Sequence, residues 1–161
     1  MQTTVDLSAL PTIEQPRRIA ILKSKWYPEY VESMAQACEK LLREYGYEDI
    51  VQHTLPGSLE LPLAARDLLV EDKERQIDAL ICFGVIVKGA TLHFEMISHE
   101  CMRGLGRLME EFRTPIVVEV IPVFDIKDAA ERAADDEFNK GIEAAATAIE
   151  MVAWRSQHAS S

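Results

Sequence analysis

An almost wholly apolar segment, Ile77–Val87, limits the possible folds of this chain more than any other stretch. Apart from Asp78 it contains branched, aromatic and small residues, without the apolar–polar alternation of a strand that has one exposed face. A strand buried on both faces is typical of parallel sheets whose two sides are covered by helices. The segment therefore predicts an α/β architecture.

Shorter strand-like and helix-like patterns alternate around this segment. The expected order is a strand at 17–23, a helix from Pro28 to Gly46, a strand at 49–54, a helix from Pro62, the apolar strand, a helix at 93–112, a strand at 116–123, and helices at 126–134 and 137–153. With right-handed connections this order predicts a flavodoxin-like, three-layer α/β/α sandwich with a four-stranded parallel sheet in the order 2-1-3-4. No G-x-G-x-x-G motif follows the first strand, so a dinucleotide-binding fold is not indicated.

The length of 161 residues fits a single domain with a complete hydrophobic core. We expect this domain at 17–154, after an irregular N-terminal arm at 1–16 and before a polar C-terminal tail at 155–161. The arm lacks the pattern of a signal peptide, and no apolar run has membrane-spanning length, so we expect no membrane association. The three cysteines fit no metal-binding spacing, which favours reduced thiols and a cytoplasmic location.

The formal net charge of −10 excludes some classes of partner. An acidic surface repels phosphate backbones, so we expect no nucleic-acid partner. A small anionic substrate is compatible with this charge, because a local group of Lys, Arg and backbone N–H groups can outweigh it.

The turn after the apolar strand has the composition of an anion site. Ligands of open α/β sheets bind beyond the carboxyl ends of the strands, where Lys88, Gly89 and Thr91 precede the helix at 93–112. The N–H groups and dipole of a helix start favour an anion, and glycine permits its close approach. Histidine, here His93, transfers protons readily near neutral pH. Taken alone, an ordinary strand–turn–helix corner with a surface histidine explains this stretch at least as well.

Other candidate residues also have two interpretations. Trp26 could stack on a planar ring or cap the core, and Glu60 could bind substrate hydroxyls or occupy the first turn of a helix. Arg132 and Lys140 could bind anions or belong to a helix surface. A metal site is not expected, because the two histidines of the 93–112 helix fall on different faces.

Four segments, taken together and in order, resemble one known family. They are PGSLELP at 56–62, GVIVKGATLHFE at 84–95, AERAADDEFNKG at 130–141 and AATAIEM at 145–151. Through them, residues 17–152 resemble the lumazine synthases, the penultimate enzymes of riboflavin biosynthesis. The resemblance implies a transferase that condenses 5-amino-6-(D-ribitylamino)uracil with 3,4-dihydroxy-2-butanone 4-phosphate to 6,7-dimethyl-8-ribityllumazine, releasing phosphate and water without a cofactor or metal.

The resemblance also implies a role for each matching residue. His93 matches the residue that transfers protons, and Arg132 matches a catalytic arginine that binds phosphate. The phosphate turn matches Gly89, Ala90 and Thr91. The implied substrate-binding residues are Trp26, Ser58, Leu59, Glu60, Ile86, Val87, Lys88, Val118 and Lys140. In the family, the residues matching Arg132 and Lys140 come from the neighbouring subunit.

Several positions depart from the family pattern. Pro122-Val123 stands where many members have Thr-Thr, Val118 where Phe is common, and Glu119 where a small residue is common. Asp135-Asp136 occupies a stretch that often carries Lys or Gly. These departures motivate an alternative, a catalytically weak relative that binds a lumazine or flavin or forms a shell. A phosphosugar isomerase or aldolase of similar fold would explain the anion turn but not the PGSLELP loop.

The resemblance further implies self-association. The family forms homo-oligomeric pentamers, and some members assemble these into decamers or 60-subunit icosahedral shells. The short 134–139 connection resembles that of shell-forming members. Riboflavin synthase, which acts next in the pathway, is a further expected partner.

Overall fold

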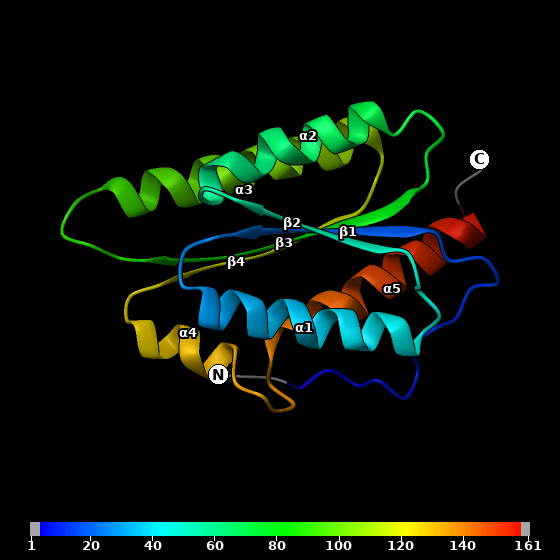
Figure 1. Cartoon of the computed structure of the whole chain (residues 1–161), viewed down its shortest axis with the longest axis horizontal. Coiled ribbons are helices and arrows are strands. Elements are labelled where there is room, and N and C mark those ends of the chain that lie inside the picture. The colour runs from blue at the N-terminus through cyan, green and yellow to red at the C-terminus, as the bar shows by residue number, and fades with distance from the viewer. Residues whose placement is uncertain (1–3, 159–161) are drawn as a thin grey trace.

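A computed structural model describes residues 4–158 and contains, over that range, one parallel sheet of four strands in the order β2-β1-β3-β4 (Figure 1). The strands are β1 (Arg18–Ser24), β2 (Ile50–Leu55), β3 (Ile77–Val87) and β4 (Ile116–Val123). The fold and strand order predicted from the sequence are confirmed, and the apolar segment forms the inner strand β3 between β1 and β4.

Helices cover both faces of the sheet (Figure 1). One face carries α1 (Pro28–Glu44), α4 (Ile126–Arg132) and α5 (Lys140–His158), and the other carries α2 (Leu61–Glu71) and α3 (His93–Phe112). Proline occupies the first turn of both α1 and α2, where its missing N–H breaks no hydrogen bond. Gly46 follows α1 with φ of 91°, the left-handed conformation that favours glycine after a helix.

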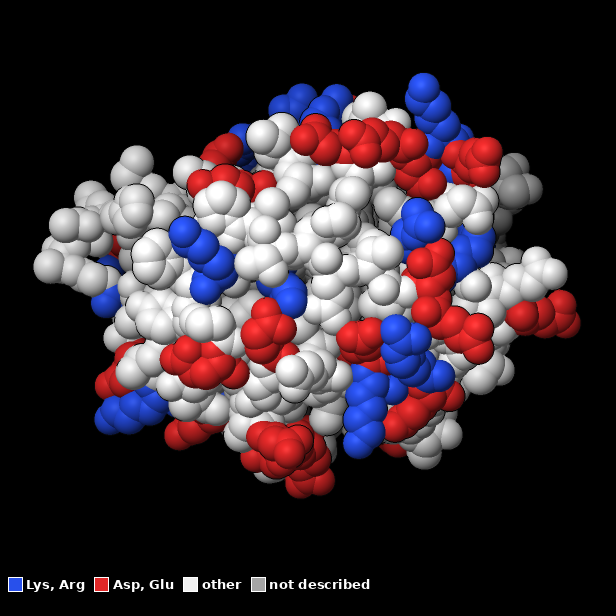
Figure 2. Space-filling view, viewed as in Figure 1, with Lys and Arg blue, Asp and Glu red and all other residues white. Residues whose placement is uncertain are grey.

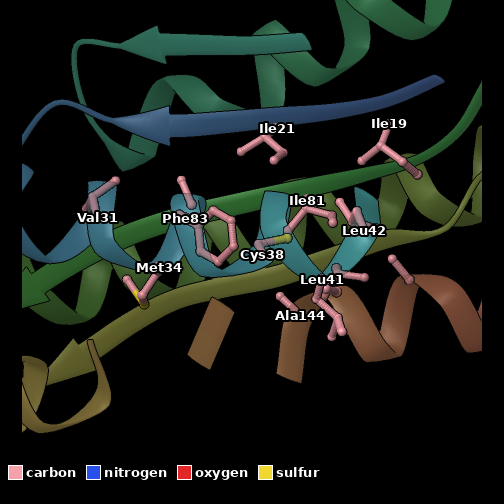
Figure 3. Packing of buried hydrophobic residues seen from close by; sticks show 14 of the residues in the cluster. Ile19, Ile21, Val31, Met34, Cys38, Leu41, Leu42, Ile81, Phe83 and Ala144 are labelled. Carbon is pink, nitrogen blue, oxygen red and sulfur yellow. The ribbon is translucent and has the colours of Figure 1, made fainter. Parts of the chain in front are cut away.

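The sheet separates two hydrophobic cores, which explains why β3 is apolar on both faces. Side chains alternate along a strand, so Ile81 and Phe83 face α1 and α5 while Leu80 and Cys82 face α2 and α3. Figure 3 shows the first core, in which Phe83 lies among side chains from α1 and the neighbouring strands.

Small residues bring α1 and α5 close together. Ala144, Ala145 and Ala148 of α5 are fully buried, and a Cβ atom added at Gly141 would lie 1.9 Å from the carbonyl oxygen of Met34. The alanine-rich composition of this helix therefore serves close packing.

Residues 4–16 precede β1, and helix α5 forms the other end of the described chain. Residues 4–16 form no helix or strand, but Leu10 and Ile13 pack against the α1–α5 core. The last helix was predicted to end at residue 153, but α5 continues to His158, whose ring stacks on Trp154 at a centroid distance of 4.8 Å. Residues 1–3 and 159–161 lie outside the described range. None of the helices formed between residues 4 and 158 is long and apolar enough to cross a bilayer.

Candidate active site

Most of the residues predicted to bind the substrates follow the carboxyl ends of the parallel strands, at the left of Figure 1. Trp26 follows β1, the loop containing Ser58 and Glu60 follows β2, and the turn containing Gly89 follows β3. Because β2, β1 and β3 are neighbours in the sheet, three segments that are distant in sequence meet at one edge.

Trp26 and Glu60 lie beside each other around Gly57. A Cβ atom added at Gly57 would lie 3.2 Å from Oε2 of Glu60 and 3.7 Å from Nε1 of Trp26. Gly57 is buried, whereas Trp26 is 59% exposed and Leu59 is 49% exposed. An indole and a carboxylate are thus available to solvent within reach of one ligand: the indole offers a stacking surface and the carboxylate accepts hydrogen bonds.

Ser58 fixes the β2 loop against the central strand. Its side chain is buried, and a Cβ atom added at Gly84 would lie 2.8 Å from its hydroxyl oxygen and 3.5 Å from Cβ of Ser24. Only glycine at position 84 leaves room for this contact. Close packing against Ser58 therefore explains why a glycine occupies position 84 inside a strand, and the sequence alone did not reveal this contact.

The turn after β3 is open to solvent at the start of α3. Gly89, Ala90 and Thr91 are exposed, and a Cβ atom at Gly89 would meet no atom within 4 Å. The helix has no side-chain cap at Leu92, and the nearest contact is a 3.4 Å hydrogen bond from the backbone N–H of His93 to the Thr91 hydroxyl. The first N–H groups of α3 are therefore available to an anion, with the exposed His93 as the first helical residue.

Lys88 precedes this turn, and its ammonium group is already paired with a carboxylate. Its backbone N–H donates to the carbonyl oxygen of Val123 at 2.8 Å, and its ammonium group pairs with the Glu95 carboxylate and lies 5.2 Å from the centre of the Phe94 ring. The hydrogen bond from Lys88 lowers the pKa of Glu95. An anion at this turn would share Lys88 with Glu95.

Arg132 and Lys140 lie on the opposite side of the sheet from α3 (Figure 1). Arg132 donates to the carbonyl oxygen of Asp128 at 2.8 Å, and the Lys140 ammonium pairs with Glu143 at 2.5 Å. Within residues 4–158 no hydrogen bond or ion pair joins either cation to the turn or to the Trp26–Glu60 pair. One chain therefore assembles only part of the predicted set.

Among the apolar members of the predicted set, Ile86 and Val87 end β3, whereas Val118 lies within β4 opposite Cys82. Ile86 and Val118 are partly buried and pack against the α2–α3 core, whereas Val87 packs against the α1–α5 core. No three His, Cys, Asp or Glu side chains of the described range are grouped so that they could hold a metal ion.

Comparison with known proteins identifies the family of this chain. The family model for 6,7-dimethyl-8-ribityllumazine synthase matches residues 16–156. The chain belongs to this family. Among curated proteins, the 6,7-dimethyl-8-ribityllumazine synthase of Aquifex aeolicus is 40% identical over 136 residues, covering 83% of this chain and 86% of the relative. That of Pectobacterium atrosepticum is 36% identical over 138 residues, covering 84% and 87%.

Among solved structures, a sigma-54 interaction domain protein from Enterococcus faecalis matches 90% of this chain and 98% of its own, at 13% identity and a TM-score of 0.37. This likeness is too weak to inform either fold or function. The lumazine synthase assignment rests on sequence.

One partly buried ionisable group, Glu119, was noticed in the sequence only as a departure from the lumazine synthase pattern. Burial, together with the nearby Glu143 carboxylate, raises the pKa of Glu119 from 4.5 to about 7 against the opposing effect of the Lys140 ammonium. Glu119 belongs to β4, where its register partner is Phe83. The sequence signal was a charged residue inside the apolar run of β4, which is unusual in a covered sheet.

Proposed function

We propose that this chain condenses 5-amino-6-(D-ribitylamino)uracil with 3,4-dihydroxy-2-butanone 4-phosphate to 6,7-dimethyl-8-ribityllumazine, as a transferase of riboflavin biosynthesis. The observation that carries this proposal is membership of the lumazine synthase family over residues 16–156. The curated relatives bear the name of the same enzyme over most of the chain.

The Trp26–Glu60 pair fits the pyrimidine substrate. The exposed indole stacks on the uracil ring, and the adjacent Glu60 carboxylate accepts hydrogen bonds from the ribityl hydroxyls. Ser58 holds the intervening loop on β3, so that Leu59 and the ends of Ile86 and Val87 form the walls of the same pocket. The proximity of Trp26 and Glu60 to the Gly57 Cβ position supports this arrangement.

The turn at 89–91 fits the phosphate of the second substrate. The N–H groups at the start of α3 and the Thr91 hydroxyl bind the phosphate oxygens, and Lys88 adds positive charge. His93, one residue into the helix, transfers protons as the pyrimidine amine attacks the ketone, water leaves and phosphate is expelled. Holding both substrates in register supplies much of the rate, because the condensation becomes effectively unimolecular.

Arg132, Lys140 and Val118 act from a neighbouring subunit in this proposal. The position of Arg132 and Lys140 on the opposite face of the sheet from the α3 turn supports it, as does the family resemblance. We therefore infer a homo-oligomer, with pentamers as the unit that closes each site and decamers or 60-subunit shells as further assemblies. A cytoplasmic location and association with riboflavin synthase remain predictions from the sequence.

The first test mixes the two substrates with the protein and follows the fluorescence of the lumazine product. We expect turnover above the spontaneous reaction, and His93→Ala is expected to lower kcat by about 10²-fold or more. His99→Ala is the matched control, because His99 is also exposed on α3 but lies beyond the turn. A protein that forms no product above the spontaneous rate would contradict the proposal.

A second test addresses the shared site. His93→Ala and Arg132→Ala subunits, each inactive alone, are unfolded, mixed equally and refolded. Random assembly leaves about a quarter of the sites with both native residues, so activity returns to about that fraction if each site spans two subunits. If one chain supplied both residues, the mixture would stay as inactive as its components.

The alternative, a weakly catalytic relative that binds a lumazine or flavin or forms a shell, is not favoured by the comparisons. It predicts tight binding of the lumazine without turnover in the same assay.

A further inference from the structure

A hollow with an unusual concentration of arginine lies at the edge of the sheet opposite the proposed active site. Its volume is about 600 Å³, within the range of small-molecule pockets. Arg17 precedes β1, Arg75 precedes β3 and Arg113 precedes β4, while Arg155 comes from the last turns of α5. Because the strands are parallel, their amino-terminal ends meet at one edge and bring these four guanidinium groups to one cavity.

The lining carries a net positive charge that the cavity itself does not neutralise. Asp78 is the one acidic residue among the lining residues, and it is already committed to Arg17. Its carboxylate accepts hydrogen bonds from the Arg17 backbone N–H at 2.7 Å and from Nε of the same side chain at 2.9 Å. The charges of Arg75, Arg113 and Arg155 are left without a carboxylate from the lining.

The known contacts of these three arginines do not explain their grouping. Arg75 donates to the carbonyl oxygen of Phe112 at 3.2 Å, which satisfies the end of α3 but neutralises no charge. Within residues 4–158 the guanidinium groups of Arg113 and Arg155 form no hydrogen bond or ion pair. Arg75 and Arg113 also have φ of 54° and 53°, a left-handed conformation in which glycine is the usual residue. The termination of α3 alone would favour glycine at position 113, and the turn before β3 would favour it at position 75.

The protein as a whole is acidic, so a cluster of arginines without paired carboxylates stands out against its net charge. The net charge is −10, and Figure 2 shows acidic side chains distributed over the visible face with Lys and Arg interspersed. A hollow lined by three unneutralised arginines departs from that background, and its like charges repel one another in the absence of a counter-ion.

We propose that this hollow binds a small anion carrying two or more phosphoryl groups. Guanidinium groups bind phosphate oxygens through paired hydrogen bonds, and several of them around one cavity suit an anion with several charged groups. Ser156 adds a hydroxyl donor, and Ile13, Ile77 and Val152 form an apolar wall against which a further group such as a base can pack. The site is separate from the α3 turn and lies at the other end of the parallel strands.

The experiment measures binding of pyrophosphate, ATP and inorganic phosphate to the assembled protein by titration calorimetry at fixed ionic strength. The test variant is Arg113→Gln combined with Arg155→Gln, because neither guanidinium group forms a hydrogen bond or ion pair within residues 4–158, so the fold should be retained. Arg103→Gln is the matched control, an arginine exposed on α3 and paired with Glu100. Pyrophosphate and ATP are expected to bind the parent and the control, and the double variant to bind each about tenfold or more weakly.

A third variant, Arg132→Ala, distinguishes this hollow from the proposed phosphate site of condensation. We expect Arg132→Ala to leave pyrophosphate binding at the hollow unchanged, and the double variant to form lumazine at the parental rate. If ATP binds more tightly than pyrophosphate, its base contacts the apolar wall. If the two bind equally, the hollow recognises the phosphoryl groups alone. Binding that is equal in parent and double variant, binding abolished by Arg132→Ala, or no binding of either polyphosphate would overturn the proposal.

Discussion

Replacing Glu119 by glutamine should stabilise the protein, and more so as the pH rises. Glu119 lies between Val117 and Ile121 on β4, and both of these face the α1–α5 core, so the carboxylate faces that core as well. The charged and titratable groups around it are Glu143 and Lys140 of α5 and the Cys38 thiol of α1. Burial and the Glu143 carboxylate raise its pKa from 4.5 to about 7, against the opposing effect of Lys140.

The sign and size of the effect follow from linkage. Below pH 4.5 the carboxyl is protonated in both folded and unfolded chains and carries no penalty. As the pH rises, the unfolded chain ionises first, and the folded state loses stability until the folded group also ionises near pH 7. At 1.36 kcal/mol per pKa unit the full penalty is about 3 kcal/mol, of which about 2 kcal/mol develops between about pH 5.5 and about pH 8. Glutamine has nearly the same shape and does not ionise.

The assay is urea unfolding of the parent and Glu119→Gln at these two pH values, at one protein concentration because the free energy of an oligomer depends on it. The stability gained by the variant should be about 2 kcal/mol larger at the higher pH. Glu150→Gln, an exposed carboxyl on α5, controls for the loss of one negative charge. A gain that is the same at both pH values, or a variant that is less stable at the higher pH, would refute the reasoning.

Two further predictions concern packing. Gly141→Ala should destabilise the protein by about 3 kcal/mol or more, because its Cβ would lie 1.9 Å from the Met34 carbonyl oxygen. The Cβ of Gly106→Ala in α3 meets nothing within 4 Å, so this control should gain about 0.5–1 kcal/mol of stability. Urea unfolding of both variants tests this, and equal effects would contradict it. The three cysteines should not react with a thiol reagent at about pH 8 until the protein is unfolded, because all three are buried. Burial raises the pKa of the Cys101 thiol to about 11 and raises the pKa values of Cys38 and Cys82 still more. Rapid labelling of the native protein would disprove their burial.

The fold was predictable because its signals are local and periodic. The apolar run of β3, the prolines at the starts of α1 and α2 and the glycine after α1 each act through neighbouring residues. The error at the end of α5 has a different origin. Residues 155–158 are polar, and nothing in their composition indicates that the helix continues. In the structure Nδ1–H of His158 donates a hydrogen bond to the Trp154 carbonyl oxygen at 2.9 Å, and the imidazole stacks on the indole ring.

The candidate site was predictable only in part, because its geometry depends on contacts between distant segments. The position of Trp26 after the first strand was readable, but its place beside Glu60 requires β1 and β2 to be neighbours. Lys88 was expected to face an anion, and the sequence did not indicate that Glu95 would pair with it. The buried carboxyl of Glu119 likewise acquires its raised pKa from burial, which only the packed structure defines.

The position of β4 gives the proposed cross-subunit site a physical basis. β4 is the edge strand next to β3, so the turn after β3 lies near the side of the sheet that a neighbouring chain can approach. Arg132 and Lys140 follow β4 but lie on the opposite face from α3, where the sheet itself separates them from His93. A cation on that face reaches a phosphate at the start of α3 more readily from an adjacent chain than around its own sheet. If so, Arg132→Ala should leave little activity, chiefly by raising KM for the phosphorylated substrate, without altering the fold of the chain that carries it.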